Sequence, residues 1–198
     1  TLKKQYPGAH IAFIKYSRGG TAIDSKAGAQ KRFGAWDPDW NGGEGEGRGI
    51  NQYDHFQATL KHAFADKDLD DDGESDTLVP SGIFWMQGES DADSEEVARR
   101  YESNLGELMN LIRKDLGETD KKIPVVIGRI TNWKVWKFGG IVREAQASFV
   151  RKDGRAALVT SADSYKNSDP WHYDTAGYLD LGEQFAKAVI SLEKSGKK

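Results

Sequence analysis

Short apolar runs alternate with longer amphipathic segments along most of this chain, and this alternation is the feature that most limits its fold. Four runs rich in strand-forming side chains lie at residues 10–16, 83–86, 124–130 and 156–160. Apolar side chains recur at helical spacing over residues 53–65, 94–116, 140–151 and 175–192. Strands that alternate with helices favour a mainly parallel sheet covered on both faces. The sequence therefore predicts an α/β fold, a three-layer α/β/α sandwich.

Composition narrows the class of protein further. A chain of 198 residues has the length of one domain and can bury a core without metal or disulfides, so we expect a single domain over residues 1–198. The net charge of -3 and the dispersed Lys and Arg residues argue against nucleic-acid binding, and no apolar run is long enough to span a membrane. The absence of cysteine excludes thiol catalysis and Cys-ligated zinc.

Three polar or glycine-containing segments each follow a predicted strand. They are Gly19-Gly20, Gln87-Gly88-Glu89 and the segment from Asp169 to His172. In an open α/β sheet, ligands bind beyond the carboxyl ends of the strands, so these segments are candidates for one site. A glycine turn and a side-chain amide can supply N–H groups to an oxyanion, which is one requirement of acyl transfer.

Asp169 and His172 lie three residues apart, and Pro170 between them favours a turn. A carboxylate beside an imidazole fixes the tautomer and stabilises the imidazolium, while the other ring nitrogen takes a proton from a nucleophile. Taken alone, the pair also fits a surface loop that caps a helix. Together with the two other segments it indicates the acid and base of a catalytic triad.

An acidic segment between the first helix and the second predicted strand matches half of a calcium-binding loop. Alternate aspartates followed by a glycine form a D-x-D-x-D-G pattern, in which carboxylates converge on one hard cation. Val79 occupies the twelfth position, where an EF-hand has a bidentate acid. Two interpretations stay open: a solvated acidic loop, or a structural Ca²⁺ site with the ligands Asp68, Asp70, Asp72 and Asp76.

Four blocks of this sequence resemble motifs of the SGNH/GDSL hydrolase superfamily, in its sialate O-acetylesterase-like and carbohydrate esterase family 6-like branch. Residues 84–91 (FWMQGESD) are similar to the W-x-Q-G-E-S-D block of that branch. Residues 17–21 (SRGGT), residues 142–146 (VREAQ) and the D-x-x-H pair at Asp169 and His172 resemble its other blocks. The resemblance extends from about residue 9 to residue 190.

The resemblance implies a flavodoxin-like SGNH fold and a serine esterase that removes O-acetyl groups from carbohydrates without a catalytic cofactor. Acetylxylan and acetylated sialic acid are both candidate substrates, and a secreted or periplasmic location is expected. His172 would be the general base and Asp169 its orienting carboxylate. The Gly20 N–H and the Gln87 amide would hold the oxyanion. The supporting positions would be Gly19, Gly88 and Glu89.

The nucleophile of this family is a serine in a G-Q-S-N or G-D-S block after the first strand, and residues 1–198 contain no such block. Residues 1–6 resemble the end of a helix, so we expect the first strand and its serine to precede Thr1 and the domain to be incomplete at its N-terminus. Two alternatives remain open. Ser90, in a sequence similar to a G-x-S-x-G elbow, could be the nucleophile, or the chain could bind or organise carbohydrate without catalysis.

Overall fold

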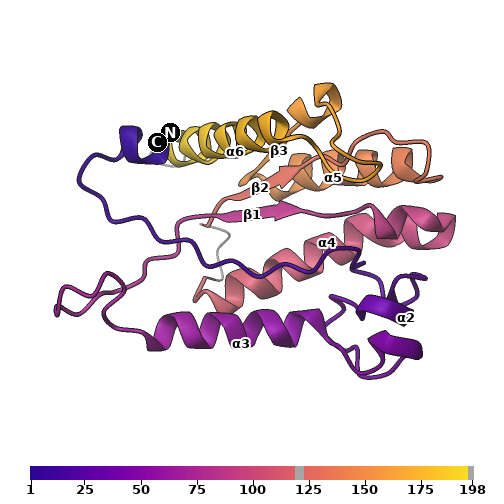
Figure 1. Cartoon of the computed structure of the whole chain (residues 1–198), viewed down its shortest axis with the longest axis horizontal. Helices are drawn as coiled ribbons and strands as arrows, with labels where there is room; N and C mark the ends of the chain where they lie inside the picture. Colours follow the sequence, from indigo (N-terminus) through magenta and orange to yellow (C-terminus); the bar gives the residue numbers. More distant parts are fainter. Residues whose placement is uncertain (119–122, 196–198) are drawn as a thin grey trace.

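Three parallel strands form the centre of the computed structural model, which describes residues 1–118 and 123–195 (Figure 1). They are β1 (Ile83–Met86), β2 (Val125–Gly128) and β3 (Ala156–Val159), in the order β1-β2-β3. The register places Ile83 beside Val125 and Val125 beside Ala156. The predicted α/β class with a parallel sheet is therefore confirmed.

Helices connect and cover the strands. The longer helices are α3 (Gln52–Ala65), α4 (Glu95–Asp115), α5 (Gly139–Asp153) and α6 (Thr175–Ser195). Two single-turn helices are α1 (Leu2–Gln5) and α2 (Gln30–Phe33), and three 3₁₀ turns are η1 (Gly45–Gly47), η2 (Ser90–Asp93) and η3 (Ser161–Ser164). The described helices include none that is long and apolar enough to cross a membrane.

The two faces of the sheet bury separate hydrophobic cores, as alternation along a strand requires. Val125 and Ile127 pack with side chains of α4 and α5, among them the fully buried Leu105. Val126 between them packs on the opposite face with Leu181 of α6. Complete burial of one such leucine contributes about 1.5–3 kcal/mol. The helices therefore form two outer layers around the sheet, as the sequence predicts.

The strand predicted over residues 10–16 is absent, so that prediction is wrong. In the described structure, residues 10–18 form no backbone hydrogen bond with a neighbouring strand, and Phe13 is 69% exposed. Strand-forming composition produces a strand only where another edge satisfies its backbone N–H and C=O groups. No such edge pairs with this segment, which stays extended but irregular.

A segment as long and glycine-rich as residues 28–49 is typical of a lid or of disorder, but here it folds into turns around α2. Gly49 donates its N–H to the Gly42 carbonyl at 2.8 Å. Gly34 has a φ of +70°, and a Cβ there would lie 1.8 Å from the Ile50 carbonyl oxygen, so only glycine fits. Trp36 is 5% exposed and meets Trp85 edge to face, which makes it a core residue rather than part of a lid.

Candidate active site

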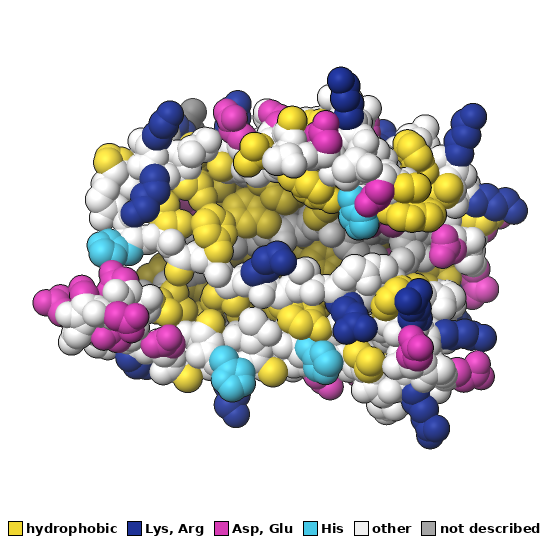
Figure 2. All heavy atoms as spheres, in the orientation of Figure 1, with side chains coloured by type: hydrophobic (Ala, Val, Ile, Leu, Met, Phe, Trp, Pro, Cys, Tyr) yellow, Lys and Arg dark blue, Asp and Glu magenta, His cyan; other side chains and the backbone are white. Residues whose placement is uncertain are grey.

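The loops that follow the three strands meet at one edge of the sheet, because the strands are parallel. The loop after β1 contains residues 87–93, the loop after β2 contains residues 129–138, and the loop after β3 contains residues 160–174. The glycine turn at residues 18–21 joins them through hydrogen bonds to the first loop. The long face of the molecule that Figure 2 shows is hollowed along its middle, in the direction of the strands, and hydrophobic side chains form much of the floor of this hollow.

The side chains of Asp169 and His172 contact each other directly. The Nδ1 atom of His172 lies 2.8 Å and 3.0 Å from the two carboxylate oxygens of Asp169. The hydrogen bond with His172 holds the pKa of the Asp169 carboxyl below its usual range, and backbone N–H groups of Trp171 and His172 add to this effect. Both side chains are exposed, so a substrate can reach the imidazole.

The two ends of the loop that carries this pair are hydrogen-bonded to each other. Asn167 and Tyr173 form an antiparallel bridge, and the Ser168 N–H donates to the His172 carbonyl at 2.9 Å. Tyr173 is 7% exposed and anchors the loop in the core beneath α6. Because the ends of the loop are fixed, the His172 ring can take only a limited set of positions.

No serine hydroxyl bonds the His172 ring within the part of the chain that the structure describes. The Ser168 hydroxyl donates to the Tyr173 carbonyl at 3.1 Å instead. The Ser90 hydroxyl donates to the Gly20 carbonyl at 2.9 Å, so Ser90 joins the glycine turn to the β1 loop. With Nδ1 bonded to Asp169, the Nε2 atom of His172 has no hydrogen-bond partner among the described residues.

Gly20 holds the glycine turn in a conformation that a side chain would not tolerate. Its φ is +76°, and a Cβ there would lie 2.6 Å from the ring of Phe33. Among the described residues its N–H has no hydrogen-bond partner, and the residue is exposed. The Gly20 N–H is therefore available to an oxygen of a ligand. Gly19 is exposed and extends the same turn.

Asp91 connects the segment just after the glycine turn to the β1 loop, a role that its sequence pattern does not indicate. It is fully buried, and its carboxylate accepts from the N–H groups of Ile23 at 3.0 Å and Asp24 at 3.1 Å. The Gln87 amide donates to it at 2.6 Å. Burial raises the pKa of Asp91 to about 6, although these hydrogen bonds favour the carboxylate.

The oxyanion role predicted for Gln87 does not fit this geometry. Its amide nitrogen donates to the Thr21 carbonyl at 2.9 Å and to Asp91, and these two bonds use both protons. The Tyr101 hydroxyl donates to the Gln87 backbone carbonyl at 2.7 Å. Gln87 thus supports the loop, and the Gly20 N–H is the predicted oxyanion donor that remains available.

Gly88 and Glu89 also shape the β1 loop. Gly88 has a φ of +146°, and a Cβ there would lie 2.9 Å from Val142 and 3.2 Å from the Tyr101 hydroxyl. Burial raises the pKa of the Glu89 carboxyl, while the N–H groups of Gly88 and Glu89 itself oppose that rise. The close packing around Gly88 leaves no room for a side chain at that position.

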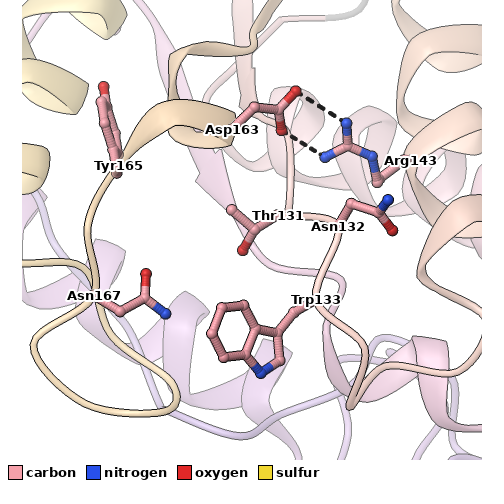
Figure 3. A pocket seen from close by; sticks show the side chains of 7 residues that line it. All are labelled: Thr131, Asn132, Trp133, Arg143, Asp163, Tyr165 and Asn167. Atoms are coloured by element: carbon pink, nitrogen blue, oxygen red, sulfur yellow. Dashed lines mark hydrogen bonds and ion pairs between the residues drawn. The ribbon is translucent and has the colours of Figure 1, made fainter.

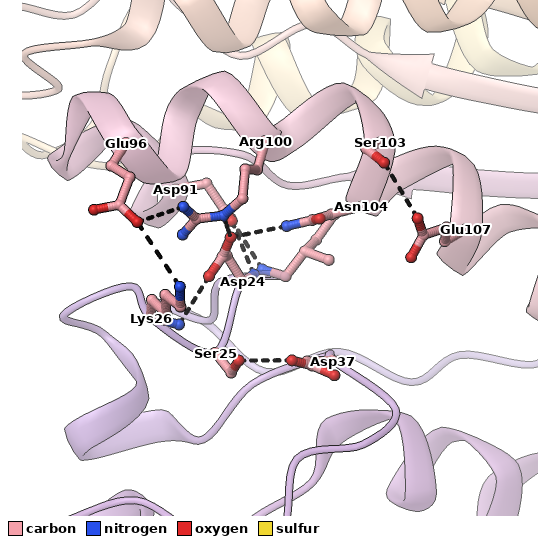
Figure 4. A network of polar contacts seen from close by, with 11 residues as sticks. Asp24, Ser25, Lys26, Asp37, Asp91, Glu96, Arg100, Ser103, Asn104 and Glu107 are labelled. Atoms are coloured by element: carbon pink, nitrogen blue, oxygen red, sulfur yellow. Dashed lines mark hydrogen bonds and ion pairs between the residues drawn. The ribbon is translucent and has the colours of Figure 1, made fainter.

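A polar network fixes the far side of the glycine turn against α4 (Figure 4). Asp24 accepts from Arg100 at 2.7 Å and from Asn104 at 3.0 Å. Burial opposes ionisation of Asp24, but the hydrogen bonds from Arg100, the Lys26 N–H and Asn104 together hold its pKa below the usual value. The turn is therefore held by Asp91 on one side and by α4 on the other.

A pocket of about 430 Å³ opens beside the His172 loop (Figure 3). Arg143 and Asp163 form a bidentate ion pair on one side of it, at 2.7 Å and 3.0 Å. Trp133 and Asn167 lie on facing sides of the opening. The lining residues are Thr131, Asn132, Trp133, Arg143, Asp163, Tyr165 and Asn167.

Three of the four aspartates predicted to bind calcium converge. One oxygen from each of Asp68, Asp70 and Asp76 lies within 4.8 Å of the others. Asp72 is not in this group, and its carboxylate accepts from the Glu74 N–H at 2.8 Å. His10, which the sequence does not connect with this loop, lies 3.2 Å from Asp70.

Comparison with known proteins identifies the family of this chain. A family model described as carbohydrate esterase, sialic acid-specific acetylesterase matches residues 1–191. A solved structure of the Arabidopsis thaliana protein AT4G34215 is 25% identical with a TM-score of 0.56, over 73% of this chain and 54% of that one.

A carbohydrate acetylesterase of Xanthomonas citri, XAC1771, is 20% identical with a TM-score of 0.44, over 56% of this chain and 26% of that one. No curated protein matches the chain. The chain thus spans about half the length of the Arabidopsis protein and a quarter of the Xanthomonas protein.

We predict that replacement of His172 by Phe raises the pKa of Asp169, because the largest contribution that lowers it is the hydrogen bond with His172. Carbon-13 NMR titration of the Asp169 carboxyl in both proteins measures the change. Asp180, whose low pKa depends on Tyr165, is the internal control and should titrate alike in both. Equal titration of Asp169 in the two proteins would show that the pair does not form in solution.

Proposed function

The chain belongs to the carbohydrate esterase family of sialic acid-specific acetylesterases, and from this we propose that the protein hydrolyses O-acetyl esters of carbohydrates through His172 and Asp169. The observation that carries the proposal is the exposed pair itself. The Nδ1 atom of His172 is bonded to the Asp169 carboxylate, whose pKa is lowered, and the Nε2 atom of His172 is left for a nucleophile. Acetylated xylan and acetylated sialic acid both contain the ester that this chemistry requires.

In the proposed reaction, Nε2 of His172 takes the proton of a serine hydroxyl while its oxygen attacks the acetyl carbon. Asp169 stabilises the imidazolium that forms. The Gly20 N–H donates to the oxyanion of the tetrahedral intermediate. When this intermediate collapses, the sugar oxygen leaves with the proton from His172, and water then hydrolyses the acetyl-enzyme by the same steps. The products are acetate and the free sugar hydroxyl.

We propose that the serine comes from outside the present sequence. Two observations support this: the resemblance to a family whose nucleophile precedes the glycine block, and the absence of a serine bonded to His172 among the described residues. Ser90 is a poorer candidate, because its hydroxyl proton is donated to the Gly20 carbonyl. The sequence around Ser90 also lacks the last glycine of the G-x-S-x-G motif, because Ala92 occupies that position.

We predict that His172→Ala lowers the turnover of p-nitrophenyl acetate by the intact protein at least about 10²-fold, the usual contribution of a general base. The matched control is His62→Ala, an exposed histidine on α3, which should keep wild-type turnover. Initial rates at saturating ester measure both. Wild-type turnover in the His172 variant would exclude His172 as the general base.

One alternative function is non-catalytic carbohydrate binding, and the missing serine contact is the observation that favours it. The two functions differ in product: an esterase releases acetate from acetylated xylo-oligosaccharide, whereas a binding protein retains the glycan unchanged. Saturable binding without acetate release, measured on the intact protein, would select the alternative.

We also propose that Asp68, Asp70 and Asp76 hold one structural Ca²⁺, whose charge would offset the repulsion among the three carboxylates. The Asp68 oxygens already accept from the N–H groups of Asp72 and Gly73 at 3.0 Å, which orients this carboxylate. Asp72, despite its place in the pattern, is excluded from the proposed set because its carboxylate faces Glu74.

Calcium at a concentration about 100-fold above its Kd should stabilise the folded chain by about 2.7 kcal/mol. For a domain of this size we therefore expect a rise of several degrees in Tm, reversed by EDTA. Asp70→Asn should abolish the response, and Asp39→Asn, at an exposed aspartate in a different loop, should keep it. A Tm indifferent to calcium and EDTA would rule out a stabilising ion.

A further inference from the structure

Strand β1 has a pairing partner on one side only. In the described structure it pairs with β2, and the Ile83 N–H donates to the Pro124 carbonyl at 2.9 Å. Because successive N–H groups of a strand point to opposite sides, those of Phe84 and Met86 point to the other edge of the sheet, where no described strand pairs with them. A free edge of apolar residues is a template for another strand.

Residues 10–16 run beside this edge and are also unpaired. Figure 1 shows the segment passing along β1 in the direction of the strand arrow, before the chain reaches α2. None of its backbone N–H groups donates to another described residue. Its composition is typical of a strand, as that of β1 is. Two segments of strand composition thus lie side by side without a hydrogen bond between their backbones.

Aromatic rings connect this segment with β1 on both faces of the sheet. On the α6 face, the ring centroid of Phe13 lies 6.5 Å from that of Phe84. On the α4 face, the Trp36 ring lies 5.5 Å from that of Tyr16 and 5.1 Å from that of Trp85, centroid to centroid. Between these contacts the molecule is hollow: the depression in Figure 2 lies at the position of β1, and the segment forms one of its borders. We call this space the strand gap.

The position of α1 shows from which face of the sheet the chain reaches residues 10–16. The connections from β1 to β2 through α4 and from β2 to β3 through α5 share one face. Almost all crossovers between parallel strands are right-handed, so a connection in the opposite direction, from the strand gap to residues 10–16, must pass over the other face. That is the α6 face, and α1 lies there: Leu2 packs against the core that contains Leu181 and Val189 of α6. The chain therefore enters residues 10–16 from the face that a crossover from the strand gap requires.

We propose that a fourth parallel strand occupies the strand gap and pairs with β1 and with residues 10–16, and that it belongs to the part of this protein that precedes Thr1. It supplies the N–H and C=O groups that both unpaired segments lack. Its carboxyl end lies at the same edge of the sheet as Gly20 and His172, which places the next residue where the serine of the proposed reaction is needed. That last point rests on the proposed function; the pairing itself does not.

The rings on the α6 face limit the side chains of the added strand. Neighbouring strands lie about 4.8 Å apart, so two strands that flank a third lie about 10 Å apart. The Phe13 and Phe84 rings, whose centroids are 6.5 Å apart, therefore reach over the strand between them. We expect glycine or alanine at the position beneath these rings, because a larger side chain would separate them.

Hydrogen exchange of the intact protein, followed by NMR without substrate, tests the pairing. The amides of Phe84 and Met86, unpaired in the described structure, should exchange at least about 100-fold more slowly than an unbonded amide. Over residues 10–16 every second amide should be protected, because only those that face the strand gap find an acceptor. The hydrogen-bonded Ile83 amide is the slow control, and the amide of the exposed Val79, which has no backbone hydrogen bond among the described residues, is the fast control.

Nuclear Overhauser effects between neighbouring strands identify the segment in the strand gap. We expect them to assign a segment that precedes Thr1 and has glycine or alanine between Phe13 and Phe84, with protection that does not depend on protein concentration. Fast exchange at Phe84 and Met86 would overturn the proposal. Protection that is lost on dilution, which indicates a strand from a second copy, or a strand from any other part of the protein would overturn it equally.

The exchange measurement can fail while the esterase proposal stands, because no ester is involved. Slow exchange at both amides would likewise remain if the intact protein released no acetate. Fluorophosphonate labelling of the same protein then locates the nucleophile. We expect the labelled serine directly after the assigned strand, and a labelled serine elsewhere would contradict the placement of the nucleophile at its carboxyl end.

Discussion

The buried carboxylate of Asp91 is the contact on which the site depends. It accepts from the backbone N–H groups of Ile23 and Asp24, just after the glycine turn, and from the Gln87 amide, so one side chain joins segments 68 residues apart in the chain. Each buried donor left without its acceptor costs about 1–3 kcal/mol, and loss of this carboxylate would leave three. The position of Gly20 relative to the β1 loop follows from this contact.

The parallel sheet and the Asp91 contact position different parts of the site. The strands bring the three loops to one edge, and Asp91, with Asp24 and Arg100 on the opposite side, attaches the glycine turn to them. The pair of Asp169 and His172 is exposed and needs little burial, because Asp169 orients His172 within a loop of a few residues. The site therefore combines a rigid buried support with an exposed His172 side chain.

Much of this arrangement could be predicted from the sequence, because helices and buried strands leave a periodic pattern and D-x-x-H is a local contact. The failures have physical reasons. Residues 10–16 have strand composition, but a strand also needs a pairing edge, which composition does not reveal. Gln87 belongs to the expected motif, yet only the fold shows that Thr21 and Asp91 use its amide protons. The pocket beside Trp133 depends on loops far apart in sequence and left no local signal.

Covalent labelling with a fluorophosphonate tests the central claim most directly, because the reagent captures a serine that a neighbouring base has activated. In the intact protein we expect one labelled serine, outside residues 1–198 by peptide mapping. The label should be lost in His172→Gln and retained in His62→Gln. A label on Ser90, or full labelling of the His172 variant, would contradict the account.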